Sequence, residues 1–453
     1  MFLRILKSAS GWGMMSLCIR LLSAAILLPL TTRLLSASEL GYWYLFTNFY
    51  AAIVVFDFGV TSASSRGMAM MLAELHVAGD KEKIRARLAA FYGSCRTVYK
   101  WVAASTFIFL SIGGGWWIWQ RTADFPQATE VRHAWLLTCP AFALAIAGNF
   151  GRSLLSGTNR INMFQFLSAC AFALQFVVGV GGLLAGWGLS ALVAANLAMF
   201  SVLAIGLPFA LLNPGSLAES GPWQRGTPRE MRSLLKVSAG TFCNSLSSFI
   251  VLNAPVLAAS HFLSIEEVGR YGLSLQVILI ASQASNIWVE VKGPVLVHLY
   301  RANPKELPRV FVQRMRLALA TYITCIVGAV LVGPTLLTLI GSHTQILGLP
   351  LFLTLATMVF FVLHAGLFDA FCMGLGYNPF IKPYLISAIA GVLLATYFAP
   401  ALGLWAFILG PLAAQLLWNA WWVPKQGLRL VGITPVEYFS RMIFGRASLP
   451  FTK

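Results

Sequence analysis

The residues best suited to chemistry are a few ionisable side chains that lie inside otherwise apolar stretches. Arg20 stands about ten residues into the first such stretch, Asp57 lies between two phenylalanines, and His364 and Asp369 share a later stretch. An arginine keeps its charge in proteins, a carboxylate can attract a cation or take up a proton, and an imidazole titrates near neutral pH. These residue types predict the binding of an anionic load together with proton- or cation-dependent gating.

Each of these residues also has a structural interpretation that the sequence leaves open. An ion pair of Asp57 with Arg66, or with Arg20 on the neighbouring helix, would reduce the cost of burying both charges. Arg20 faces either a carboxylate or an aqueous lumen, and we favour the lumen. His364 is more often a hydrogen-bonded interior residue than a proton relay, and it lies about 140° from Asp369 around a helix.

Composition indicates which elements must position these residues. The chain has 453 residues, of which 58% are hydrophobic and only 10% charged, against about 25% charged in soluble domains. So much apolar surface cannot be hidden inside a soluble globule, and lipid must surround most of the chain. The net charge of +17 then reflects basic loops that set orientation rather than affinity for nucleic acid, and we expect no nucleic-acid partner.

Runs of about 20 apolar residues predict about twelve membrane-spanning helices. Their approximate limits are 11–35, 40–63, 89–119, 133–156, 161–186, 188–212, 236–260, 269–295, 313–341, 346–375, 381–400 and 402–423. Nearly all Lys and Arg residues outside the spans fall on the side of the N-terminus, the exceptions being Arg33, Arg121, Arg132 and Arg270. The positive-inside rule places that side, and both termini, in the cytoplasm.

The two halves of the chain repeat each other. The segment from Leu35 to Gly41 is matched by the segment from Leu263 to Gly269, and weaker matches follow in the same order. We therefore expect an all-α polytopic membrane protein with two bundles of about six helices in the same orientation, a parallel repeat used by transporters. The predicted parts are an N-terminal bundle 1–212, a cytoplasmic linker 213–235, a C-terminal bundle 236–423 and a basic cytoplasmic tail 424–453.

A second polar cluster lies at the end of the stretch 269–295, where Glu290 and Lys292 are followed by Arg301. It takes the place in the second half that Asp57 and Arg66 take in the first. Both halves are thus expected to put polar residues at the inner mouth of the protein.

Sequence motifs of enzymes are missing from the chain. It contains no G-x-x-x-x-G-K-[ST], no H-E-x-x-H and no G-x-S-x-G. The longest outer loop, from about Gln120 to Arg132, is too short for a catalytic domain. We expect a transporter with no catalytic residues, no metal and no cofactor, and we favour it over a membrane-embedded glycan polymerase or ligase.

Several short motifs resemble a known family. They are the basic Ser/Gly-rich start from Lys7 to Gly13, the Leu35 to Gly41 hinge with its copy at Leu263 to Gly269, the Phe56 to Arg66 segment and the Gly157-x-Asn159 turn. On these residues the chain resembles the oligosaccharide flippases, the Wzx-type O-antigen and exopolysaccharide translocases. These belong to the multidrug/oligosaccharidyl-lipid/polysaccharide (MOP) exporter superfamily, which also contains the MATE multidrug transporters.

The resemblance implies two six-helix bundles around a V-shaped cavity that opens alternately to either side. The implied load is an undecaprenyl-pyrophosphate-linked oligosaccharide, moved from the inner to the outer leaflet of a bacterial inner membrane for cell-surface polysaccharide synthesis. Membrane lipids and polysaccharide polymerase or assembly proteins are the other implied partners. Arginines present several donors to phosphate oxygens, so we expect Arg20, Arg66, Lys292 and either Arg301 or Arg152 to hold the pyrophosphate.

Asp57, Glu290, Asp369 and His364 are the predicted coupling or gating residues. Lipid II flippases of the superfamily typically carry two more helices than this chain, which argues against a lipid II flippase. Multidrug antiporters have twelve spans and use acidic residues inside the membrane, so a cation-coupled antiporter is the alternative. The basic candidates outnumber the acidic Asp57 and Asp369, and we therefore favour the anionic load.

Overall fold

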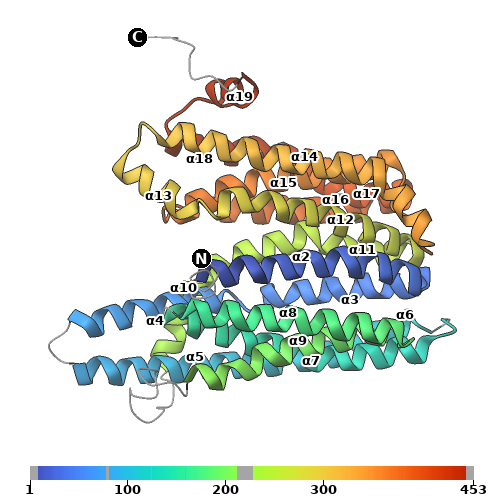
Figure 1. Cartoon of the computed structure of the whole chain (residues 1–453), viewed down its shortest axis with the longest axis horizontal. Coiled ribbons are helices and arrows are strands. Elements are labelled where there is room, and N and C mark those ends of the chain that lie inside the picture. The colour runs from blue at the N-terminus through green and yellow to red at the C-terminus, as the bar shows by residue number, and fades with distance from the viewer. Residues whose placement is uncertain (1–8, 78–80, 124, 159, 212–227, 445–453) are drawn as a thin grey trace. The chain divides into compact units, whose positions relative to one another are not determined.

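The structure is a computed structural model of the chain, and it describes all residues except 1–8, 78–80, 124, 159, 212–227 and 445–453. Its described elements are helices joined by short turns (Figure 1). The chain divides into two compact units, Met1–Leu246 and Ser247–Lys453. This division lies inside helix α10 (Pro228–Leu252), about ten residues beyond the predicted start of the second bundle, and most of the predicted linker lies outside the described residues.

The first unit is built around α7. Its elements are α2 (Ala9–Leu34), α3 (Ala37–Phe56), α4 (Val60–Val77), α5 (Lys81–Phe109), the π-helical turn η1 (Leu110–Gly114), α6 (Gly115–Arg121), α7 (Ala128–Gly157), α8 (Ile161–Leu184), α9 (Leu189–Leu211) and the first part of α10. Helix α7 packs against α9, α4 and α5, and α8 packs against both α2 and α9. Figure 1 shows α7, α8 and α9 running alongside one another.

The second unit contains two pairs of closely packed long helices. Its elements are the end of α10, α11 (Ala254–Phe262), α12 (Ile265–Glu290), α13 (Gly293–Ala302), α14 (Leu307–Ile340), α15 (Leu349–Gly374), α16 (Ile381–Leu402), α17 (Leu404–Ala414), the π-helical turn η3 (Gln415–Asn419), α18 (Ala420–Val431) and α19 (Pro435–Phe444). Helix α12 packs on α14, and α16 on α17. The last span continues to Val431, so α18 and α19 occupy much of the predicted tail.

Among the described residues, 11 helices or runs of adjoining helices are long and apolar enough to cross a membrane. They cover the predicted spans with the exception of 40–63. That segment forms α3 of 20 residues, which carries Glu39, Thr47 and Asn48, and the chain then leaves the helix at Asp57. The all-helical polytopic fold class is confirmed, with a count of eleven in place of about twelve.

The repeated hinge motif has a physical cause. In both units a helix ends and a serine starts the next helix: Ser36 before α3 and Ser264 before α12. Each serine side chain accepts from the backbone N–H of a glutamate three residues on, and that glutamate, Glu39 or Glu267, accepts from the serine backbone N–H. These capping boxes satisfy helix donors that would otherwise lack partners, which explains why Ser and Glu recur at this spacing.

Aromatic side chains fill the interior of each unit, while large apolar residues also cover the outside. Trp135 and Phe142 of α7 are fully buried in the first unit, and Phe311 and Phe368 are fully buried in the second. Residues such as Leu339, which is 80% exposed, point outward from the spans. A soluble protein would not expose so many large apolar side chains, so lipid is their solvent.

Candidate functional site

The first candidate site is the break between α3 and α4. Asp57 follows the last residue of α3, and the next two residues take left-handed backbone conformations, with φ of 50° at Phe58 and 69° at Gly59. Phe58 is the one non-glycine residue with positive φ in the described part of the chain. Such a conformation is unfavourable for a residue with a side chain, so the surrounding structure must hold the break in place.

Helix α10 packs directly on this break. A Cβ atom added to Gly59 would lie 2.7 Å from the carbonyl oxygen of Ser238 and 2.8 Å from Cβ of Thr241. The Phe58 ring lies against Phe242, with 5.1 Å between ring centroids. Glycine at position 59 therefore serves two needs, a left-handed turn and the close approach of a neighbouring backbone.

Hydroxyl groups surround the carboxylate at the break. Asp57 is 6% exposed, and Thr61 donates to it twice, from its backbone N–H at 3.1 Å and from its hydroxyl at 2.6 Å. The hydroxyl of Tyr99 on α5 lies 2.7 Å from that of Thr61, and since Thr61 donates to Asp57, Tyr99 donates to Thr61. The result is a largely buried chain of three polar groups, contributed by the break itself, α4 and α5.

Asp57 does not form the expected ion pair with Arg66. The Arg66 Nε donates to the backbone carbonyl of Ser62 at 3.3 Å, and the side chain of Arg66 is exposed. The cation that acts electrostatically on Asp57 is Arg152 of α7. Arg152 is itself exposed and lies over the ring of Phe164, 5.5 Å from the centroid, close enough for a cation–π contact.

Arg20 lies near the middle of α2 and is exposed within the first unit. The predicted basic residues of this unit, Arg20, Arg66 and Arg152, are thus carried by three different helices, α2, α4 and α7. All three side chains are on the surface of their unit. The binding of a pyrophosphate by these three arginines stays a prediction.

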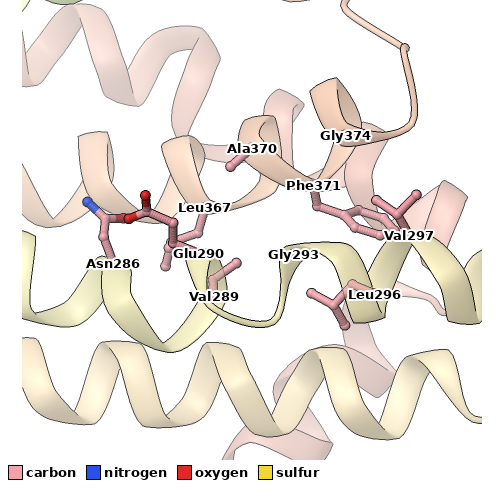
Figure 2. Close-up of a pocket in the computed structure, with 10 residues that line it drawn as sticks. All are labelled: Asn286, Val289, Glu290, Gly293, Leu296, Val297, Leu367, Ala370, Phe371 and Gly374. Atoms are coloured by element: carbon pink, nitrogen blue, oxygen red, sulfur yellow. The ribbon is translucent and has the colours of Figure 1, made fainter. Parts of the chain in front are cut away.

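The second unit has a corresponding break between α12 and α13, and a pocket of about 420 Å³ opens beside it. Figure 2 shows the pocket between the α12–α13 segment and α15, with the side chains of Asn286 and Glu290 next to each other at one end. Its other lining residues are apolar or glycine: Val289, Gly293, Leu296, Val297, Leu367, Ala370, Phe371 and Gly374. Glu290 is therefore the acidic group of an otherwise mostly apolar pocket.

The basic residues predicted for this half lie next to the same break. Lys292 is the N-cap of α13 and is half-buried, and Arg301 is exposed in the last turn of α13. Neither residue is among those that line the pocket. Glu290 and Lys292 thus lie two residues apart at the break, while Arg301 stands about two and a half turns further along α13.

The two predicted residues of α15 have different surroundings. The Nε2 atom of His364 is 3.1 Å from the hydroxyl of Tyr438 on α19, and both side chains are buried. The carboxylate oxygen Oδ1 of Asp369 is buried without a hydrogen-bond partner among the described residues. The same is true of the hydroxyl of Tyr384 on α16. His364 therefore has the surroundings of a hydrogen-bonded interior histidine, whereas Asp369 keeps an unsatisfied acceptor.

Sequence reasoning missed Thr61, Tyr99 and Tyr438. A signal existed for Thr61, because in the helix predicted over 40–63 a threonine four residues after Asp57 lies on the same side. No signal in the sequence points to Tyr99 or Tyr438, which reach their partners through tertiary packing. Within the described ranges no three His, Cys, Asp or Glu side chains gather in a way that would hold a metal ion.

Neither a family model nor a curated protein sequence matches the chain. Solved structures do match. An inward-facing multidrug resistance MATE family transporter of the MOP superfamily has a TM-score of 0.71 at 12% sequence identity, covering 93% of this chain and 99% of that one.

Two further solved structures are similar over nearly the whole length. The MATE multidrug transporter DinF-BH gives a TM-score of 0.65 at 14% identity, covering 98% of this chain and 97% of that one. The lipid II flippase MurJ in an inward closed conformation gives 0.64 at 12% identity, covering 96% and 90%. The chain therefore has the fold shared by MATE transporters and MurJ of the MOP superfamily.

Proposed function

We propose that this protein is a flippase that moves an undecaprenyl-pyrophosphate-linked oligosaccharide from the cytoplasmic to the periplasmic leaflet by alternating access. The observation that carries the proposal is the exposed position of Arg20, near the middle of helix α2 and inside the candidate span Met15–Leu34. A guanidinium cannot lose its charge, and its exposure to lipid tails would cost several kcal/mol or more. A polar path beside Arg20 would remove this cost, and a polar path through a membrane bundle is what a transported headgroup needs.

The exposed basic side chains of each unit favour an anionic load. Arg66 and Arg152 are exposed on the same unit, and Arg152 is steadied over Phe164. Lys292 and Arg301 add positive charge at the break in the second unit. A pyrophosphate offers several acceptor oxygens to such groups, and charge-assisted hydrogen bonds to it are about twice as strong as neutral ones.

The decisive experiment measures the leaflet distribution of undecaprenyl-linked oligosaccharide in cells with and without the protein, by labelling the glycan from the periplasm. Loss of the protein should leave the glycolipid on the inner leaflet. In the same cells Arg20→Ala and Arg66→Ala should each lower flipping about 10-fold or more, because a hydrogen bond to a charged group contributes about 1.5–3 kcal/mol. Arg33→Ala, at the exposed end of the same helix α2, is the matched control and should flip at the wild-type rate.

A cation-coupled multidrug antiporter is the second candidate, and the buried acids favour it. Asp57 is buried in the first unit, and Asp369 of the second has an unsatisfied oxygen. This function would leave the leaflet distribution unchanged when the protein is lost and would change drug sensitivity instead. In that case Asp57→Asn and Asp369→Asn should abolish drug export, and the arginine variants should not.

A further inference from the structure

The short helix α19 carries one of the largest clusters of exposed apolar residues outside the spans. Val436 is 76%, Phe439 58% and Ile443 71% exposed. Their spacing of three and four residues places them on one side of the helix. We call these three residues the α19 apolar face.

Helix α19 is nevertheless a fixed part of the second unit. Tyr438 is 1% exposed, and its hydroxyl lies 3.1 Å from Nε2 of His364. Its ring packs edge-on against Phe368, with 5.6 Å between centroids. Because Tyr438 lies on a different side of α19 from the apolar face, docking on α15 leaves that face uncovered.

The start of α19 is also determined by its own sequence. The backbone N–H of Thr434 donates to Oε2 of Glu437 at 2.9 Å, and the N–H of Glu437 donates to the Thr434 hydroxyl at 3.2 Å. This is a third capping box like those at Ser36 and Ser264. The α19 apolar face is therefore presented in a defined direction by a capped and anchored helix.

The position of α19 in the chain points to what covers this face. Helix α18 is the end of the last membrane span, Leu404–Val431, and Gly432, with φ of 81°, turns the chain immediately after it. Only three residues thus separate the end of the span from the start of α19. An apolar face at that depth meets the boundary between headgroups and acyl chains, where amphipathic helices bind.

Charge supports the same conclusion. Lys425 and Arg429 are exposed on α18, and Arg441 follows on α19, with Glu437 as the one acid of that helix. Basic side chains next to an apolar helix face are attracted by anionic lipids, at about 1 kcal/mol for each Lys or Arg near the surface. Neither a second copy of this chain nor a soluble partner would need this combination at the end of a span.

We propose that α19 is an interfacial anchor whose apolar face inserts among the lipids of the leaflet at which α18 ends, with Lys425, Arg429 and Arg441 next to anionic headgroups. Because Tyr438 joins this helix to His364, the anchor holds α15 at a fixed depth relative to the membrane surface. The proposal is independent of the transported load.

The test uses the full-length protein with single nitroxide labels at Phe439→Cys or Ile443→Cys, in vesicles of phosphatidylcholine with and without one third phosphatidylglycerol. Lys305→Cys, on the exposed turn before α14, is the control. The native cysteines that are not buried are first replaced by alanine: Cys18, Cys170, Cys243 and Cys325. Collisions of each label with oxygen, which concentrates in lipid, and with a water-soluble nickel chelate are then measured.

We expect the oxygen-to-nickel collision ratio to be several-fold higher at positions 439 and 443 than at 305, and to rise further at 439 and 443 when phosphatidylglycerol is present. Equal ratios at all three positions would show a solvated face and overturn the proposal. Labels at 439 and 443 that are shielded from both reagents and coupled to each other between copies would show a dimer contact, which also overturns it. A ratio that does not respond to phosphatidylglycerol would refute the role of the basic residues.

Discussion

The break after α3 can be tested by giving Gly59 a side chain. In Gly59→Ala the new Cβ must adopt a left-handed φ of 69° and would lie 2.7 Å from the Ser238 carbonyl oxygen. The backbone conformation costs about 1–2 kcal/mol, and forcing a methyl group into a filled space costs about 1–3 kcal/mol. The expected loss of stability is therefore about 2–5 kcal/mol.

Two other glycines of the same unit separate these two costs. Gly186 also has a positive φ, of 79°, but a Cβ there would meet no atom within 4 Å, so Gly186→Ala should lose only the conformational part, about 1–2 kcal/mol. Gly181 lies inside α8 with open space around it. Gly181→Ala should be neutral or stabilising by up to about 1 kcal/mol, because alanine is the better helix former.

The assay is thermal unfolding of the purified protein in detergent, followed by circular dichroism at a fixed heating rate because such unfolding is often irreversible. At about 2–4 °C per kcal/mol for a unit of this size, Gly59→Ala should lower the midpoint by about 4–20 °C and Gly186→Ala by about 2–8 °C. If Gly59→Ala lowers it no more than Gly186→Ala does, α10 does not pack on the break, and the reasoning fails.

Three further predictions concern polar contacts. Thr61→Val removes the hydroxyl that donates to the buried carboxylate and should cost about 1–3 kcal/mol in the same assay, whereas Thr61→Ser should restore most of it. Ser36→Ala and Ser264→Ala should each cost about 1 kcal/mol, and a much larger loss at either would contradict equivalent caps. The backbone N–H of Thr434 lowers the pKa of Glu437 below its ordinary 4.5, so this cap stabilises α19 fully above that pH and is lost as the pH falls through the lowered pKa. Spin-label mobility on α19 should rise in acid, and a pH-independent signal would refute the cap.

Much of this fold could be predicted from the sequence, because span length and capping chemistry are local properties. The apolar runs located the long helices, and the Ser-x-x-Glu motif at Ser36 and Ser264 marked the same turn in both halves. The interruption at Asp57 was not predicted, although Gly59 directly after an aspartate and a phenylalanine was a usable signal. An apolar run fixes the length of a span but not a break within it.

The arrangement of the site residues was harder to predict. Helices that are apolar on all sides give no periodicity from which their rotation could be read. Whether Asp57 meets Arg66 or Arg152 depends on how α4 turns against α7, and the pairing of His364 with Tyr438 joins residues 74 positions apart. Such contacts follow from tertiary packing, so residue type identified the candidates without identifying their partners.

Each unit has a break between two helices, and the acidic residue next to the break has a different role in each unit. In the first unit the N–H of Thr61 would lack a partner at the start of α4, and Asp57 accepts from it. In the second unit Pro294 lies in the first turn of α13 and has no backbone N–H. No acidic side chain is therefore needed to accept from that position. Glu290 lines the pocket instead. Part of the role of Asp57 is thus structural, and of the two acids Glu290 is the better candidate for a direct effect on the load.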